Sequence, residues 1–255
     1  MNKNSNLYQI LYAAVMVLLV GTLLAFIYMA LKPKQNENIA NDTRKQILSA
    51  LHVASPAEAQ IKETYEKYIV QDLLVDKDGN IIDSTHNVAF NVDMKKNVKL
   101  AERQLPVMKC KIDDGSIKYV LPVYGAGLWG PIWGYIAVND DGNTIYGANF
   151  SHEGETPGLG ARIAEQPFQD EFKDKHLFVD GEFKVVQVLK KGQKTTNGAE
   201  QIDALTGATI TSRGVSDMMA DCLAPYEAFL KKLQGAEAMP EPAAIEEITD
   251  ENQTE

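Results

Sequence analysis

Three short segments of this 255-residue chain combine glycine, hydroxyl and acidic residues in a way that suits ligand binding. Residues 125–131 read GAGLWGP, residues 151–161 read SHEGETPGLGA, and residues 203–212 read DALTGATITS. Glycine lets the backbone approach a flat or charged ligand closely, and Trp129 offers a ring face for stacking. The alternative for the first segment is a hairpin corner with Trp129 folded into the core.

The third segment places four hydroxyls at or near the start of a predicted helix: Thr206, Thr209, Thr211 and Ser212. Serine and threonine in this position commonly cap the helix. The free N–H groups and the helix dipole also favour an anion such as phosphate there. The GxxxxGK[ST] pattern is absent, so nucleotide triphosphate hydrolysis is not supported.

The second segment carries His152 and Glu153, which invite a metal interpretation. The HExxH pattern is absent and the chain has only 4 histidines, so we predict no metal site. Glu155 and Thr156 are either loop and cap residues or hydrogen-bonding partners of a polar heterocycle. In the second case, glycines at 158 and 160 allow the loop to wrap around it.

The elements that must position these segments are mostly short strands. Apolar runs separated by turn residues predict strands at 68–75, 81–83, 107–112, 117–124, 132–139, 144–150, 176–179 and 183–189. The turns at 140–143 and 180–181 predict hairpins. The expected fold class is α+β, with one soluble domain whose antiparallel or mixed sheet is flanked by helices.

Four helices are expected in addition to the strands. They cover residues 36–51, a segment opening at Ser55 with a capping box closed by Glu58, residues 161–173, and residues 213–233 with a kink at Pro225. The last helix has one apolar face, formed by Val215, Met218, Met219, Cys222, Leu223, Tyr226, Phe229, Leu230 and Leu233.

Residues 10–31 form an uncharged stretch of roughly 22 residues, long enough to cross a bilayer as a helix. A cleaved signal peptide usually has a shorter apolar region and a small-x-small cleavage site, so an uncleaved anchor is the favoured interpretation. Lys32, Lys34, Arg44 and Lys45 follow the stretch while Lys3 precedes it, and this count alone favours a cytoplasmic soluble domain.

The net charge of −10 is concentrated at the C-terminal end, where seven acidic residues and no Lys or Arg follow Gly235. No basic stripe is left for neutralising phosphates, so nucleic-acid binding is not expected. The expected organisation is an N-terminal segment at 1–9, a transmembrane helix at 10–31, a helical connector at 32–72, a soluble domain at 73–234 and an acidic disordered tail at 235–255.

The three segments, in this order behind one N-terminal membrane helix, resemble a known FMN-binding domain. That domain is shared by the C-type subunit of the sodium-translocating NADH:quinone oxidoreductase and the G-type subunit of the RNF electron-transport complex. The family pattern Asp-x-x-[Ser/Thr]-Gly-Ala-Thr is met at Asp203, Thr206, Gly207, Ala208 and Thr209. The GLWGP block at 127–131 is more similar to the quinone-reductase family than to the RNF family.

The resemblance implies FMN attached through its phosphate to Thr209, installed by a flavin transferase that uses FAD as donor. It implies that Asp203 serves this transferase as a recognition residue or a metal contact. It implies that Thr206, Gly207, Ala208 and Thr211 surround the phosphate. The ribityl chain and the isoalloxazine ring would contact Leu128, Trp129, Glu155, Thr156, Leu159 and Gly160. No residue is expected to act as a general acid or base. Lys190, Lys191 and Lys194 form a solvated loop or stabilise a reduced anionic flavin.

The resemblance also implies an electron carrier within a six-subunit complex that oxidises NADH, reduces a quinone and pumps Na⁺, without turnover of its own. It implies a single-pass protein in lipid of the cell inner membrane, with the soluble domain on the periplasmic face, against the charge count. In that compartment Cys110 and Cys222 could pair, although a buried thiol suits Cys222 better. The alternatives are the G-type subunit of an RNF complex, a cofactor-free anchored binding module, and a subunit that only tethers partners.

Overall fold

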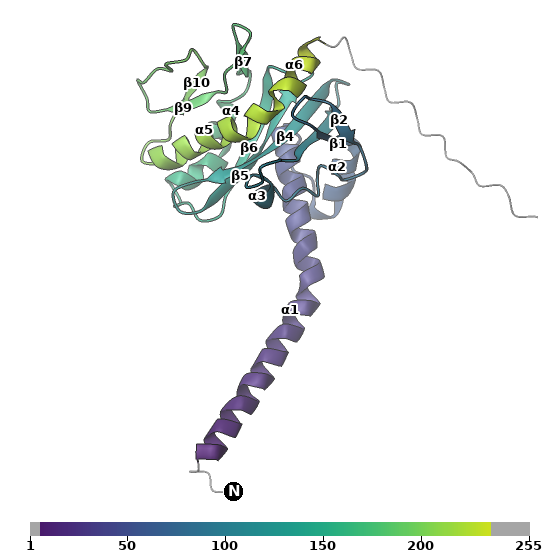
Figure 1. Cartoon of the computed structure of the whole chain (residues 1–255), viewed down its shortest axis with the longest axis vertical. Helices are drawn as coiled ribbons and strands as arrows, with labels where there is room; N and C mark the ends of the chain where they lie inside the picture. Colours follow the sequence, from purple (N-terminus) through teal and green to yellow (C-terminus); the bar gives the residue numbers. More distant parts are fainter. Residues whose placement is uncertain (1–5, 236–255) are drawn as a thin grey trace, which may run out of the picture.

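An antiparallel sheet of six strands lies at the centre of the structure, a computed structural model that describes residues 6–235. The strands lie side by side in the order β2-β1-β3-β4-β5-β6 (Figure 1). Two small ladders, β7–β8 and β9–β10, lie outside this sheet. The strands are β1 (Ile69–Val75), β2 (Ile81–Asp83), β3 (Leu105–Lys111), β4 (Ile117–Ala126), β5 (Pro131–Asn139), β6 (Ile145–His152), β7 (Phe178–Val179), β8 (Glu182–Phe183), β9 (Gln187–Leu189) and β10 (Gln201–Asp203).

Helices precede, follow and interrupt the sheet. The α-helices are α1 (Asn6–Ala50), α2 (Ile61–Tyr68), α3 (Met94–Asn97), α4 (Gln166–Asp170), α5 (Thr209–Leu223) and α6 (Glu227–Gly235). Between residues 6 and 235, three 3-10 turns complete the set: η1 (Glu58–Gln60), η2 (Gly160–Ala164) and η3 (Ala224–Tyr226). This arrangement confirms the predicted α+β class.

Both faces of the sheet are covered. Helices α5 and α6 lie across one face and the end of α1 lies on the other (Figure 1). Neighbouring residues of β4 therefore join different cores: Tyr119 and Leu121 pack on the α5 side, and Val120 packs on the α1 side. Because successive strand residues point to opposite faces, a strand covered on both sides is a continuous buried run.

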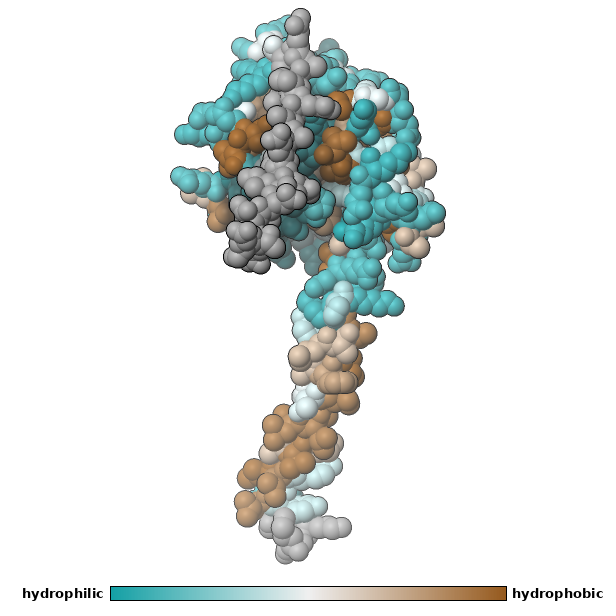
Figure 2. Space-filling view, turned by 90° about the vertical axis from the view of Figure 1, so that its right-hand side faces the viewer, coloured by the Kyte–Doolittle hydropathy of each residue, from teal (hydrophilic) through white to brown (hydrophobic). Residues whose placement is uncertain are grey.

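Helix α1 is one continuous helix of 45 residues, with Pro33 inside it. Its first part is an exposed apolar stalk, brown in Figure 2, long and apolar enough to cross a membrane. Burial begins near its end, at Ile47, Leu48 and Ala50. The Trp133 indole N–H also donates to Gln46 Oε1 at 2.9 Å, which ties the stalk to β5.

The predicted sheet strands are confirmed to within about two residues, and the hairpins at 140–143 and 180–181 are present. The predicted strand 176–179 is shorter, as β7, and 183–189 is split between β8 and β9. Two elements were missed, α3 and β10. The tail at 236–255 and residues 1–5 lie outside the described residues.

Three helix predictions need correction. The capping box at Ser55 is wrong, because Ala57 occupies the N-cap of η1 and makes no side-chain cap bond. The helix expected at 161–173 is split into η2 and α4, since Pro167 has no N–H to donate within a continuous helix. The last helix begins at Thr209 rather than 213 and is interrupted around Pro225 as predicted.

The two cysteines are free and buried on opposite faces of the sheet. Cys110 belongs to the core beneath α1, and Cys222 belongs to the core beneath α5. Burial raises the pKa of both thiols, so both are held as neutral thiols. The interpretation of Cys222 as a buried thiol is confirmed, and no disulfide links the pair.

Candidate functional site

The three glycine-rich segments come together at one end of the sheet. The first is the loop between β4 and β5, the second follows β6, and the third leads into α5. They touch directly: a Cβ at Gly207 would lie 2.9 Å from Leu159 Cδ2. Segments separated by up to about eighty residues in the sequence therefore line a single site.

Glu155 joins all three segments from the inside. It is 4% exposed. Its Oε1 accepts the Trp129 backbone N–H at 2.9 Å, and its Oε2 accepts the Thr211 hydroxyl at 2.6 Å. Its own N–H lies 3.3 Å from His152 Nδ1. Hydrogen bonds to a charged group are stronger than neutral ones, so Glu155 is the main polar link of the site.

Two glycines make room for the Glu155 carboxylate. A Cβ at Gly127 would collide with Glu155 Oε1, and one at Gly160 would collide with Glu155 Oε2. A Cβ at Gly160 would also lie 2.6 Å from Thr211 Oγ1. The glycines of these two loops are therefore needed for close packing around the acid.

Four apolar side chains point outward around this polar link. Leu128, Trp129, Leu159 and Ile210 are 46%, 69%, 44% and 60% exposed. The alternative in which Trp129 folds into the core is thus wrong. Exposed apolar side chains gathered at one place commonly mark a ligand or partner surface.

Sequence reasoning missed Ile210 as a site residue. The signal was present, because Ile210 is apolar yet falls outside the buried stripe of α5.

Helix α5 begins at Thr209, beside these apolar side chains. Its N-cap residue is Ala208, and no side chain caps the helix. Thr211 is buried against Glu155, and the Ser212 hydroxyl accepts the Leu205 N–H at 3.0 Å. Thr206 and Thr209 are exposed instead. Thr209 is therefore an exposed residue at the positive end of the dipole of α5, which has no side-chain cap.

Helix α5 reaches this position because it packs very closely against the end of β4. A Cβ at Gly214 would collide with the Ala126 carbonyl oxygen, and one at Gly125 would lie 2.7 Å from Met218 Cβ. Thr156 also supports the site through its backbone, whose carbonyl accepts the N–H groups of Leu159 and Ala161 at 3.1 Å.

The remaining predicted residues lie on the surface. Asp203 is exposed on β10, where its N–H is 3.4 Å from Glu171 Oε2. The lysines at 190, 191 and 194 are exposed in the segment between β9 and β10, and no described contact brings them to the glycine-rich loops. Their solvated-loop interpretation agrees with this placement.

Comparisons with known proteins identify the family to which the chain is similar. The FMN-binding domain family matches residues 127–224, which contain the second and third segments and residues 127–131 of the first. The chain is 30% identical to the C-type subunit of the Na(+)-translocating NADH-quinone reductase of Chlamydia trachomatis, over 89% of this chain and 92% of that protein.

Two solved structures share the fold. The C-type subunit of this reductase from Parabacteroides distasonis is 42% identical, with a TM-score of 0.72 over 78% of this chain and 96% of that one. NqrC of Shewanella oneidensis is 28% identical, with a TM-score of 0.61 over 77% of this chain and 98% of that one.

The matched domain family and the relatives define a flavoprotein with an FMN-binding domain. Within that class, the chain belongs to the NqrC family, the C-type subunits of the Na(+)-translocating NADH-quinone reductases.

Proposed function

We propose that FMN is bound covalently through its phosphate to the Thr209 hydroxyl and that the chain carries electrons within a sodium-translocating NADH:quinone reductase. One observation carries the proposal: the exposed Thr209 hydroxyl lies at the uncapped start of α5, beside exposed apolar side chains. A phosphodiester keeps one negative charge, which a helix N-terminus stabilises. When bound, FMN supplies the redox chemistry, and the protein sets its position and surroundings.

Each part of the site has a distinct role in this proposal. Leu128, Trp129, Leu159 and Ile210 supply the apolar surface for the isoalloxazine ring. Burying such surface is favourable by roughly 25 cal/mol per Å². Thr206, Gly207 and Ala208 surround the FMN phosphate. Thr156 and Gly160 form the part of the site that contacts the ribityl chain. Glu155 and Thr211 are buried, so we assign them to positioning these loops.

The attachment requires a flavin transferase. The Thr209 oxygen forms a bond to the FMN phosphorus of FAD, the pyrophosphate bond breaks, and AMP leaves while the hydroxyl proton is given up to the transferase. Asp203 is exposed, as recognition by such an enzyme requires. The transferase and the other reductase subunits are the proposed protein partners.

We further propose that α1 anchors the chain in the lipid of the cell inner membrane with the soluble domain in the periplasm. Because both native cysteines are buried, Lys191→Cys introduces a thiol that a membrane-impermeant maleimide can label selectively. We expect labelling in intact spheroplasts. Labelling only after lysis would place the domain in the cytoplasm and overturn the orientation.

The flavin linkage is tested by co-expressing the full chain with a flavin transferase and examining the denatured band for flavin fluorescence. Peptide mass mapping should then locate FMN on the peptide that contains Thr209. Thr209→Val should abolish the fluorescence with the fold intact, while the matched control Thr196→Val, an exposed threonine outside the site, should retain it.

A colourless wild-type band, despite a transferase shown to be active on another substrate, would contradict the linkage. It would favour the cofactor-free anchored module or the tethering subunit. Fluorescence retained in Thr209→Val would move the linkage to another residue. The RNF-type alternative has no observation in its favour, because the relatives named above all come from the Na(+)-translocating reductase.

A further inference from the structure

Two acidic side chains are buried among residues 6–235: Glu155, at 4% exposed, and Asp72, at 5%. Removing a carboxylate from water is costly unless hydrogen bonds or a cation stabilise its charge. Ionisable groups in such surroundings are concentrated at functional sites. Glu155 lies among the three glycine-rich segments, which makes it the candidate for a role beyond loop packing.

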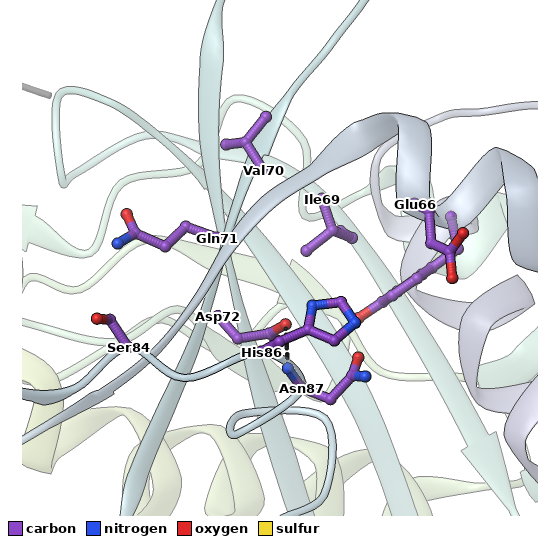
Figure 3. A pocket seen from close by; sticks show the side chains of 9 residues that line it. Glu66, Ile69, Val70, Gln71, Asp72, Ser84, His86 and Asn87 are labelled. Atoms are coloured by element: carbon purple, nitrogen blue, oxygen red, sulfur yellow. Dashed lines mark hydrogen bonds between the residues drawn. The ribbon is translucent and has the colours of Figure 1, made fainter. Parts of the chain in front are cut away.

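The two buried acids differ in their hydrogen bonds. Both Glu155 oxygens accept one, from the Trp129 N–H and from the Thr211 hydroxyl. Asp72 lies on β1 beside an open cavity (Figure 3), and only its Oδ2 has a partner, the Asn87 N–H. Donors at both oxygens stabilise the ionised form of a carboxyl group. Glu155 is therefore a buried carboxylate.

No positively charged side chain offsets this carboxylate. Among the described residues, no Lys, Arg or His forms an ion pair with Glu155. Arg162 pairs with Glu165 instead, and Arg213 is exposed on α5. His152 accepts the Glu155 N–H through Nδ1, and a ring nitrogen that accepts a hydrogen bond carries no proton. Glu155 thus places one uncompensated negative charge inside the site.

The Glu155 carboxylate contacts two parts of the proposed flavin site. Its Oε1 accepts from the backbone of Trp129, whose ring belongs to the apolar surface proposed for the isoalloxazine. Its Oε2 accepts from Thr211, two residues after Thr209, the proposed attachment point. Coulomb interactions are several times stronger near a buried charge than in bulk water, because the effective dielectric constant is lower.

We propose that the negative charge of Glu155 lowers the reduction potential of the flavin attached at Thr209. The inference rests on the proposed function. Above neutral pH, two-electron reduction brings two electrons from a reductant and one proton from water to the isoalloxazine, which gains one negative charge. A fixed negative charge nearby makes this gain less favourable. Glu155 therefore positions the loops and also makes the reduced flavin a stronger electron donor.

The test compares midpoint potentials of flavin-loaded full chains, prepared in detergent after co-expression with a flavin transferase. Glu155→Gln removes the charge and keeps the shape, because the amide oxygen can accept the Trp129 N–H while the amide NH₂ donates to the Thr211 hydroxyl oxygen. Glu155→Asp keeps the charge on a shorter side chain. In redox titrations with dithionite and mediator dyes, we expect Glu155→Gln to raise the potential and Glu155→Asp to stay closer to wild type.

Two matched controls each remove one acid elsewhere. Glu153→Gln removes an exposed charge two residues away, which solvent screens. Asp72→Asn removes the other buried acid, and β3 and β4 lie between its strand and β5. Neither control should shift the potential as much as Glu155→Gln. Equal potentials of wild type and Glu155→Gln, or equal shifts in Glu155→Gln and Glu155→Asp, would overturn the proposal.

A second measurement needs no substitution at Glu155. Trypsin cleavage after Lys194 and Arg213 releases a flavopeptide, residues 195–213, that contains Thr209 and lacks Glu155. The intact wild-type protein should have a lower potential than this flavopeptide. A higher potential would overturn the proposal even if Glu155→Gln fails to fold or to take up flavin. A wild-type chain without flavin would overturn the proposed function and this inference with it, whereas flavin at an unchanged potential would overturn the inference alone.

Discussion

At the scale of single residues, Glu155 is the group on which the geometry of the site depends most. Removing its side chain leaves the Trp129 N–H and the buried Thr211 hydroxyl without their acceptors. We expect Glu155→Ala to lower the free energy of unfolding by about 1–3 kcal/mol. Chemical denaturation of the full chain in detergent measures this change.

The control for this prediction is Glu153→Ala, two residues away. Glu153 is exposed, so its replacement should change the unfolding free energy by no more than about 0.5 kcal/mol. Equal effects of the two variants would show that Glu155 does not hold the loops together.

Asp72 should make stability depend on pH. Burial raises the pKa of its carboxyl, although the Asn87 N–H, His86 and the Phe90 N–H act in the opposite direction. Because the pKa of Asp72 is raised in the folded state, the fold favours the neutral acid. The contribution of this carboxyl to stability is therefore fully present below the unfolded-state pKa of about 3.9, and it is lost as pH rises through the folded-state pKa. Asp72→Asn, which cannot ionise, should therefore be more stable than wild type at pH 7.

The advantage of Asp72→Asn should shrink as pH falls toward about 4, where wild-type Asp72 becomes neutral. Thermal unfolding across this range measures the difference. Asp83→Asn is the reference variant. Its stability relative to wild type should change with pH in the opposite direction, because hydrogen bonds from Thr85 lower the pKa of Asp83. A difference between Asp72→Asn and wild type that stays constant with pH would contradict the prediction.

At the scale of elements, the approach of α5 to β4 positions the start of the helix. Alanine favours a helix over glycine by about 1 kcal/mol, yet a methyl at position 214 would meet the Ala126 carbonyl. We expect the contact to outweigh the propensity, so Gly214→Ala should lower the unfolding midpoint and reduce flavin incorporation. Asp217→Ala, an exposed change in the same helix, should do neither. A stabilised Gly214→Ala variant would show that α5 can shift outward at little cost.

The sequence predicted these elements well where periodicity was strong. The stripe from Val215 to Leu233 is buried throughout, because a helix covering one sheet face must repeat its apolar residues at helical spacing. Strand β10 was missed, because it has only three residues, which pair with β9, and so short a strand shows no clear alternation of apolar and polar residues. Residue types identified the site segments, but they did not predict which side chains point inward and which point outward. Glu155 points inward and Trp129 outward because of loop geometry, which composition does not encode.

At the scale of the whole molecule, α1 combines an exposed stalk and a buried end in one continuous helix. Residues 6–39 are exposed almost throughout, whereas Ile47, Leu48 and Leu51 are buried in the core beneath the sheet. The Asn149 amide also donates to Ser49 at 3.1 Å. The stalk and the domain are therefore joined through packed side chains, and the last turns of α1 belong to the soluble fold.

Two truncations separate these parts. Removing residues 1–35 should give a protein that is soluble without detergent and unfolds at nearly the same temperature as the full chain, because none of residues 6–35 is buried. Removing residues 1–52 also deletes the fully buried side chains of Ile47, Leu48 and Leu51, each worth about 2–5 kcal/mol in a core. Since domains are stable by only about 5–15 kcal/mol, this second protein should fail to fold or aggregate. The melting temperatures of both truncated proteins can be measured by circular dichroism. Equal melting temperatures would show that the end of α1 does not contribute to the stability of the soluble domain.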